Sequence, residues 1–144
     1  MDTHTWRPFG TRLVGGAAMF TLIAICVATW FAFPPEIRAK FTAFQFGTII
    51  FLCGIAFVVW LALVRSRVTA HEGGLTVVNG FKRRDLEWAQ LISVSLRRGA
   101  PWATLDTSDG ETLSLMAIQG SDGERALRAV RELRALIQRN SAES

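Results

Sequence analysis

The stretch Arg67-Val-Thr-Ala-His-Glu-Gly-Gly-Leu-Thr-Val-Val-Asn-Gly-Phe-Lys-Arg-Arg-Asp-Leu-Glu87 determines the fold of the polar half of this chain. Short segments rich in β-branched residues are separated here by Gly73-Gly74 and by Asn79-Gly80. Asn-Gly is a strong signal for a tight turn between antiparallel strands, because both residues tolerate positive φ. The stretch therefore predicts three consecutive strands, over residues 67–71, 75–79 and 81–87.

The same pattern continues downstream to residue 116. We expect three further strands, over residues 91–97, 102–107 and 111–116, with Ser108-Asp109-Gly110 as the turn between the last two. Ile92, Val94 and Leu96 alternate with polar residues, as expected of a sheet that buries one face. Closely spaced strands of this kind predict a small antiparallel barrel or sandwich.

The hydrophobic period becomes helical after residue 120. Ser121-Asp-Gly-Glu124 fits a capping box, and an apolar stripe follows it. The stripe consists of Ala126, Leu127, Val130, Leu133, Leu136 and Ile137. It predicts one C-terminal helix that covers an open end of the β structure. The predicted domain spans residues 65–139, and residues 140–144 are expected to form a frayed tail.

Two apolar runs precede this domain, at residues 13–33 and 46–64. Each is long enough to cross a hydrocarbon core of roughly 30 Å, which needs about 20 helical residues. Pro34-Pro35 cannot continue the first helix and breaks the chain between the runs. Residues 13–64 are therefore predicted to form a two-helix transmembrane hairpin.

Basic residues that flank the hairpin predict its orientation. Arg7 and Arg12 precede the first run and Arg65 and Arg67 follow the second, whereas the connector carries Arg38 and Lys40. Since positive charge favours the cytoplasmic side, we expect a plasma-membrane protein in which residues 1–12, the domain and both termini are cytoplasmic. A removable signal peptide is the alternative for the first run, but that run is long and lacks a small-x-small cleavage site.

Composition limits the class of protein. The chain has 144 residues, of which 50% are hydrophobic, and a net charge of +4, which leaves no room for a large soluble enzyme. The two cysteines, Cys26 and Cys53, lie inside the apolar runs, which excludes a disulfide-stapled secreted module. We attribute the basic excess to the membrane flanks and expect no nucleic-acid partner.

Several separated landmarks resemble a known family. They are residues 67–79, Leu86-Glu-Trp88-Ala-Gln-Leu-Ile92, Arg97-Arg-Gly-Ala-Pro-Trp102-Ala and Leu115-Met-Ala-Ile-Gln119. With the C-terminal helix, they are similar to the bacterial PH-domain family of small actinobacterial membrane proteins, of the low-molecular-weight antigen type. The resemblance covers residues 65–138 and implies an α+β fold, in which the hairpin precedes a PH-like antiparallel barrel or sandwich capped by one helix. It implies no enzymatic activity and no agreed ligand, and the six predicted strands are one fewer than in the eukaryotic fold.

Side chains that perform catalysis are scarce. The chain has two histidines, His4 and His71, and no tyrosine. His71 has no second ligand at metal-binding spacing, and the cluster Asp106, Asp109 and Glu111 is better explained as a solvated turn than as a calcium loop. We therefore expect no catalytic residues, bound metal or cofactor.

Two basic groups and one tryptophan are candidate contacts for a lipid or a partner: Lys82, Arg83, Arg84, Arg97, Arg98 and Trp102. The basic groups would attract anionic headgroups if they faced the bilayer. However, Asp85 and Glu87 follow the first group directly, which favours a solvated, ion-paired face. The first predicted hairpin, where phosphoinositide-binding PH domains place basic residues, is acidic and glycine-rich at residues 71–74.

Small residues predict where the membrane helices approach each other, since close backbone contact drives association inside lipid. The first run offers Ala17, Thr21, Ala24 and Ala28 on one face, and the second offers Ala43, Gly47 and Gly54. We expect these stripes to pack together, unless one of them docks onto a helix of another protein.

These observations predict a non-catalytic, membrane-anchored interaction module, or an accessory subunit of a membrane assembly. It would bind a protein partner or a second copy of itself. The alternative is a sensor of anionic lipid headgroups.

Overall fold

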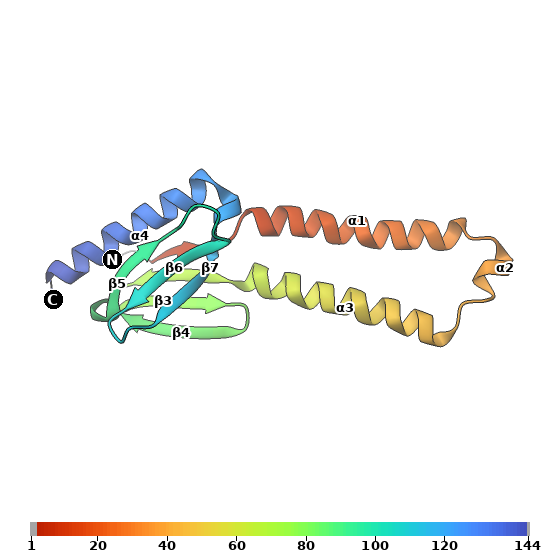
Figure 1. The fold of residues 1–144 in the computed structure, drawn as a ribbon, viewed down its shortest axis with the longest axis horizontal. Helices are drawn as coiled ribbons and strands as arrows, with labels where there is room; N and C mark the ends of the chain where they lie inside the picture. The colour runs from red at the N-terminus through yellow and green to blue at the C-terminus, as the bar shows by residue number, and fades with distance from the viewer. Residues whose placement is uncertain (1–2, 144) are drawn as a thin grey trace.

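The computed structural model describes residues 3–143. A short strand, β1 (His4–Trp6), leads into a hairpin made of α1 (Gly10–Ala32), the single-turn helix α2 (Pro35–Arg38) and α3 (Ala43–Arg65). Figure 1 shows α1 and α3 projecting side by side from a β-rich domain, with α2 at the far tip. The chain is therefore an α+β protein in which the hairpin and the domain form distinct regions.

Two antiparallel sheets build the domain. The first has the order β1-β2-β3-β4 and contains β2 (Arg67–His71), β3 (Gly74–Asn79) and β4 (Lys82–Glu87). After the short 3-10 helix η1 (Trp88–Gln90), the second sheet has the order β5-β6-β7. Its strands are β5 (Leu91–Ser95), β6 (Trp102–Thr107) and β7 (Thr112–Gln119). The sheets stay separate instead of closing into one barrel, and α4 (Glu124–Glu143) follows the 3-10 helix η2 (Gly120–Asp122).

One hydrophobic core joins the two sheets and α4. Its members come from every layer and include Val68, Leu75, Val77, Val94, Leu105, Leu115, Val130 and Leu133. On β6, buried residues alternate with partly exposed ones, as expected of a strand with one buried face. The PH-like domain predicted from the sequence is therefore present, with a buried core.

The structure contains a seventh strand where the sequence analysis predicts none. β1 pairs antiparallel with β2, so that His4 lies opposite Ala70 and Trp6 lies opposite Val68. The first strand of the domain thus precedes the hairpin, and the hairpin occupies the connection between the first two strands. Three residues are too few to show a strand period, and the pairing partner is distant in the sequence, which explains why the pattern did not reveal it.

Helix α4 covers the core as predicted, with differences at both ends. Ala126, Val130 and Leu133 are buried, but Leu127 is 40% exposed. The helix begins at Glu124, directly after Gly123 with φ of 55°, and hence later than a capping box at Ser121 would place it. At the other end the helix continues through residues 140–143 instead of ending at residue 139. The Asn140 and Ser141 side chains donate to carbonyl oxygens one turn earlier, which favours this extension.

Both long helices are apolar and long enough to cross a membrane, and both are exposed along their length. Each begins about one turn before the apolar run predicted from the sequence. Thr42 and Gln45 form a reciprocal capping box at the start of α3, which explains its early beginning.

The two helices contact each other near their ends. At the tip, the Trp30 ring lies 5.4 Å from that of Phe41 and 5.1 Å from that of Phe46. Near the domain, Trp60 Nε1 donates to the Thr11 carbonyl oxygen at 3.4 Å. A Cβ added to Gly15 would lie 2.6 Å from Trp60 Cδ1, so only glycine allows this approach.

The small residues selected from the sequence lie on exposed faces of the two helices. Ala17, Thr21, Ala24, Ala28 and Ala43 are exposed. A Cβ added to Gly47 or Gly54 would meet no atom within 4 Å. The space beside Gly47 and Gly54 is therefore open in this structure, whereas Trp60 fills the space next to Gly15. The packing of the two small-residue stripes against each other stays a prediction.

Candidate functional site

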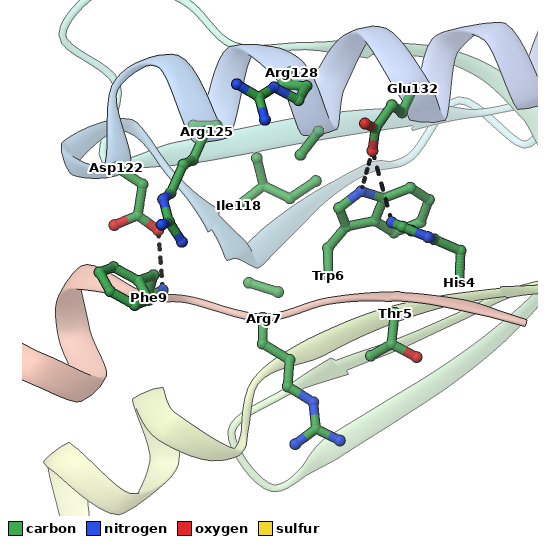
Figure 2. Close-up of a pocket in the computed structure, with 13 residues that line it drawn as sticks. His4, Thr5, Trp6, Arg7, Phe9, Ile118, Asp122, Arg125, Arg128 and Glu132 are labelled. Carbon is green, nitrogen blue, oxygen red and sulfur yellow. Dashed lines mark hydrogen bonds and ion pairs between the residues drawn. The ribbon is translucent and has the colours of Figure 1, made fainter.

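A groove of about 540 Å³ runs between β1 and the N-terminal half of α4 (Figure 2). Ala117 and Ile118 of β7 contribute apolar side chains to its lining. Charged residues from the N-terminal segment and from α4 also line it, among them Arg7, Glu132 and the pair Arg125 and Arg128. The groove thus exists only because β1 returns to the domain.

Trp6 holds β1 against α4 at one end of the groove. Its ring is buried, and Nε1 donates to Glu132 Oε2 at 3.0 Å. His4 Nε2 lies 3.6 Å from the same carboxylate oxygen, and the His4 and Trp6 rings meet edge to face at 4.5 Å. The Glu132 carboxylate is therefore already occupied by contacts with the N-terminal strand (Figure 2).

Asp122 holds the N-terminal segment at the other end of the groove. Its carboxylate accepts hydrogen bonds from the backbone N–H of Phe9 at 3.1 Å and of Gly10 at 2.8 Å. These N–H groups lie at the start of α1, so Asp122 caps that helix from a distant part of the sequence. A Cβ on Gly10 would lie 2.6 Å from Asp122 Oδ1, which explains why a glycine occupies that position.

The remaining charge of the groove is positive. The Arg125 guanidinium lies 4.0 Å from the centre of the Phe9 ring, in a cation–π contact. Within residues 3–143, neither Arg125 nor Arg128 forms an ion pair, and both are exposed. Because both carboxylates are occupied by the N-terminal segment, the groove offers two guanidinium groups above a partly apolar lining.

The titratable side chains singled out in the sequence lie in hydrogen-bonded contacts between strands. Among the described residues there is no group of three His, Cys, Asp or Glu side chains that could hold a metal ion. Thr76 contacts His71 Nε2 at 3.3 Å and also donates to Asp85, so His71 lies in a strand-to-strand polar contact. Asp106 accepts from Ser93 and Thr112, which lowers the pKa of its carboxyl.

The first predicted basic group lies on β4, at the edge of the four-stranded sheet. Lys82, Arg83 and Arg84 are all exposed. Arg83 pairs with Asp85 at 3.0 Å, and Arg84 pairs with Glu111 of the β6–β7 turn at 2.9 Å. Two of the three charges are therefore compensated within the domain.

The second predicted group lies in the loop between β5 and β6. Arg97 and Arg98 line a separate hollow of about 620 Å³ together with residues of η2 and the start of α4. Trp102 is half-buried at the start of β6 and lines a smaller hollow with Arg97. These residues lie at the three-stranded sheet, whereas Lys82, Arg83 and Arg84 lie on the four-stranded one, and none of the six lines the groove beside β1.

The sequence analysis missed the groove because it missed β1. A tryptophan in a short polar N-terminal segment was the available signal, since an isolated Trp6 next to His4 needs a surface to cover it. Arg125 and Arg128 appear in the sequence only as part of the polar face of the C-terminal helix.

Comparisons with known proteins agree with this architecture. A family model described as Bacterial PH domain matches residues 65–136. The uncharacterized protein Rv1417 of Mycobacterium tuberculosis and the uncharacterized protein Mb1452 of Mycobacterium bovis are each 30% identical to this chain over 136 residues, which is 92% of this chain and 87% of each relative. These alignments are long enough to include the helical hairpin as well as the domain. No solved structure matches the chain significantly.

Proposed function

This chain belongs to the bacterial PH-domain family, and we propose that it is a non-catalytic, membrane-anchored interaction module that holds its binding groove at the membrane surface. Two helices that are long and apolar enough to span a bilayer support the membrane part of this proposal. The groove with its two unpaired guanidinium groups supports the interaction part.

The pairing of β1 with β2 carries the proposal. The chain leaves the domain after β1, passes through α1 and α3, and re-enters the domain at β2. Two spans that start and end in one domain have their domain-proximal ends, which we call their roots, on the same side of the bilayer. The basic residues at these roots favour the cytoplasmic side. The domain then lies directly against the membrane surface, without a flexible linker at either root.

The groove defines the partner by charge and shape. Arg125 and Arg128 favour an acidic group, and the exposed Phe9 ring in the groove lining favours a segment that also buries apolar surface. We infer that the partner is a membrane protein that inserts an acidic, extended segment beside β1. The chain would then act as an accessory subunit.

The alternative is that the domain senses anionic headgroups through Lys82, Arg83, Arg84, Arg97 and Arg98. The ion pairs of Arg83 and Arg84 weaken it, because both charges already have partners. Binding of the full-length chain to anionic vesicles at low and high salt tests this alternative, since such attraction is screened by salt.

The main test is affinity purification of the full-length chain from native membranes in mild detergent. Arg125→Glu with Arg128→Glu reverses the charge of the groove, and Arg131→Glu with Arg139→Glu is the matched control on the same helix. We expect the groove variant to lose a partner that the wild type and the control retain. Retention of all partners by the groove variant, or equal loss in both variants, would contradict the proposal.

A further inference from the structure

Four arginines surround the point where the two long helices leave the domain. Arg7, Arg12, Arg65 and Arg67 line a hollow of about 240 Å³, which is completed by Val64 and Ser66. We call these four residues the root cluster. No acidic side chain lines this hollow.

The fold assembles the root cluster from two distant parts of the sequence. Arg7 follows β1 and Arg12 lies in the first turn of α1, whereas Arg65 ends α3 and Arg67 begins β2. The pairing of Trp6 with Val68 brings these parts together. Arg12 Nη2 also approaches the Val64 carbonyl oxygen at 3.5 Å, across the gap between the two helices.

The root cluster is separate from the groove beside α4. Figure 2 shows the Arg7 side chain pointing away from Arg125 and Arg128, toward the opposite side of the N-terminal segment. Although Arg7 lines both hollows, its guanidinium group therefore does not add to the charge above the groove.

The charge of the root cluster is uncompensated within the domain. None of the four arginines forms an ion pair within residues 3–143, whereas Arg83 and Arg84 on β4 both do. Four like charges around one small hollow repel each other, so an anion between them would stabilise the arrangement. Guanidinium groups bind phosphate oxygens through paired, charge-assisted hydrogen bonds, which makes phosphate the matching anion.

The neighbouring side chains indicate where this anion comes from. Phe81 is 63% exposed, and its ring lies 5.6 Å from the Arg65 guanidinium. Phe9 is 49% exposed at the root of α1. An exposed phenyl ring can enter the acyl-chain region while the neighbouring guanidinium group stays at the headgroups, so this pairing fits the border of a bilayer.

We propose that the root cluster binds the phosphate group of an acidic membrane lipid, between the roots of α1 and α3. This inference rests on the proposed membrane insertion of the hairpin. The singly charged lipid phosphate lowers the repulsion among the four arginines and joins both helix roots to the domain. The site differs from the predicted contacts at Lys82, Arg83, Arg84, Arg97 and Arg98.

The test uses the full-length chain, purified in a neutral detergent and examined by native mass spectrometry. Phosphatidylglycerol, phosphatidylcholine and inorganic phosphate are offered as probes in separate samples. Arg12→Gln with Arg65→Gln removes two charges from the root cluster, and Arg97→Gln with Arg98→Gln removes two charges from the β5–β6 loop. Circular dichroism and thermal unfolding verify that both variants retain the fold.

We expect one phosphatidylglycerol molecule to remain bound per wild-type chain, in preference to phosphatidylcholine. The root variant should bind about 30-fold more weakly, and the loop variant should bind as the wild type does. Equal weakening in both variants would indicate diffuse attraction and would overturn the site. Tight binding of inorganic phosphate without a preference for the lipid would overturn the assignment to a membrane lipid.

Lipid binding at the root cluster can be tested separately from partner binding in the groove. Loss of the protein partner in the Arg125→Glu with Arg128→Glu variant tests the proposed interaction function alone. Lipid retention in that same variant tests the root cluster alone, because neither arginine lines its hollow. If alkaline carbonate releases the wild-type chain from membranes, the membrane insertion on which both proposals depend is wrong.

Discussion

Thr5 lies directly opposite Thr69 in the antiparallel pair β1–β2, and their hydroxyl oxygens are 3.1 Å apart although 64 positions separate them in the sequence. The whole helical hairpin lies between these two residues. The domain is therefore not simply attached to one end of the hairpin, because its first strand precedes the hairpin and its other strands follow it.

Several contacts reinforce this closure. Asp122 caps α1, and the Thr11 hydroxyl donates to Gln119 at the end of β7. On the other side, Ser66 connects the end of α3 with the turn between β3 and β4. Each long helix is therefore joined to the domain by side-chain hydrogen bonds in addition to the chain itself. A movement of the hairpin would be transmitted directly to β1 and to the groove beside it.

Removing the Trp6 ring should destabilise the domain. Trp6→Ala deletes a buried aromatic side chain and should lower the free energy of unfolding by roughly 3 kcal/mol. Trp6→Phe keeps a ring but loses the hydrogen bond to Glu132, and should cost only about 1 kcal/mol. Chemical denaturation of the full-length chain, followed by circular dichroism, measures both. Equal, negligible effects would show that β1 does not contribute to the fold.

Ser66 provides a second test of the junction. It is fully buried, accepts from the Gly80 N–H at 2.9 Å and donates to the Ala62 carbonyl oxygen at 3.1 Å. Ser66→Ala leaves the Gly80 N–H without its partner and should cost about 1–3 kcal/mol. The exposed Ser121→Ala is the control, and it should change stability by no more than about 0.5 kcal/mol. Similar melting temperatures for the two variants would refute this role of Ser66.

The sequence predicts those parts of the fold that carry a local signal. Strands β2 and β6 begin and end as predicted, because glycine-containing turns and alternating side chains define their limits. β1 carries no such signal, since a strand of three residues obtains its stability from β2 and from the burial of Trp6. The groove and the root cluster both depend on β1, so neither can be predicted from the sequence when β1 is not recognised.

The position of β1 also changes which segment connects the first two strands of the domain. With β2 taken as the first strand, the acidic residues 71–74 appear to form the first hairpin of the domain. In the structure the connection from the first to the second strand is the helical hairpin, with Arg7, Arg12, Arg65 and Arg67 at its root. Long-range pairing of this kind cannot be recognised from periodicity, because no local feature identifies the partner strand.

Acidification should weaken the contacts of Asp85 at the β4 edge of the domain. The Arg83 guanidinium and the Thr76 hydroxyl both donate to Asp85 and hold the pKa of its carboxyl below the ordinary value of 3.8. Because the folded-state pKa lies below the unfolded-state pKa, ionised Asp85 stabilises the fold at pH values above the unfolded-state pKa. This stabilisation is lost as the pH falls through the folded-state pKa. An NMR titration should give a midpoint for Asp85 below 3.8, and Arg83→Gln should raise it. A wild-type midpoint at or above 3.8 would contradict the contact.

The proposed orientation predicts opposite accessibility for the two ends of the molecule. In a chain without Cys26 and Cys53, Ala39→Cys should react with an impermeant thiol reagent in intact cells. Ser141→Cys should react only after the cells are permeabilised. Both positions are exposed in the structure, so a difference between them reports the membrane side. Labelling of the Ser141→Cys variant alone would reverse the orientation.

The most direct measurement of the central claim is a disulfide between β1 and β2 in native membranes. Directly opposed residues in antiparallel strands are close enough for a disulfide, and the Thr5 and Thr69 side chains point toward each other. In a chain without Cys26 and Cys53, Thr5→Cys with Thr69→Cys should form an intramolecular disulfide under mild oxidation, detected by mass spectrometry. Thr5→Cys with Thr112→Cys, on the exposed start of β7, should not. Absence of the first disulfide, or equal cross-linking of both pairs, would contradict a domain whose first strand pairs across its own helical hairpin.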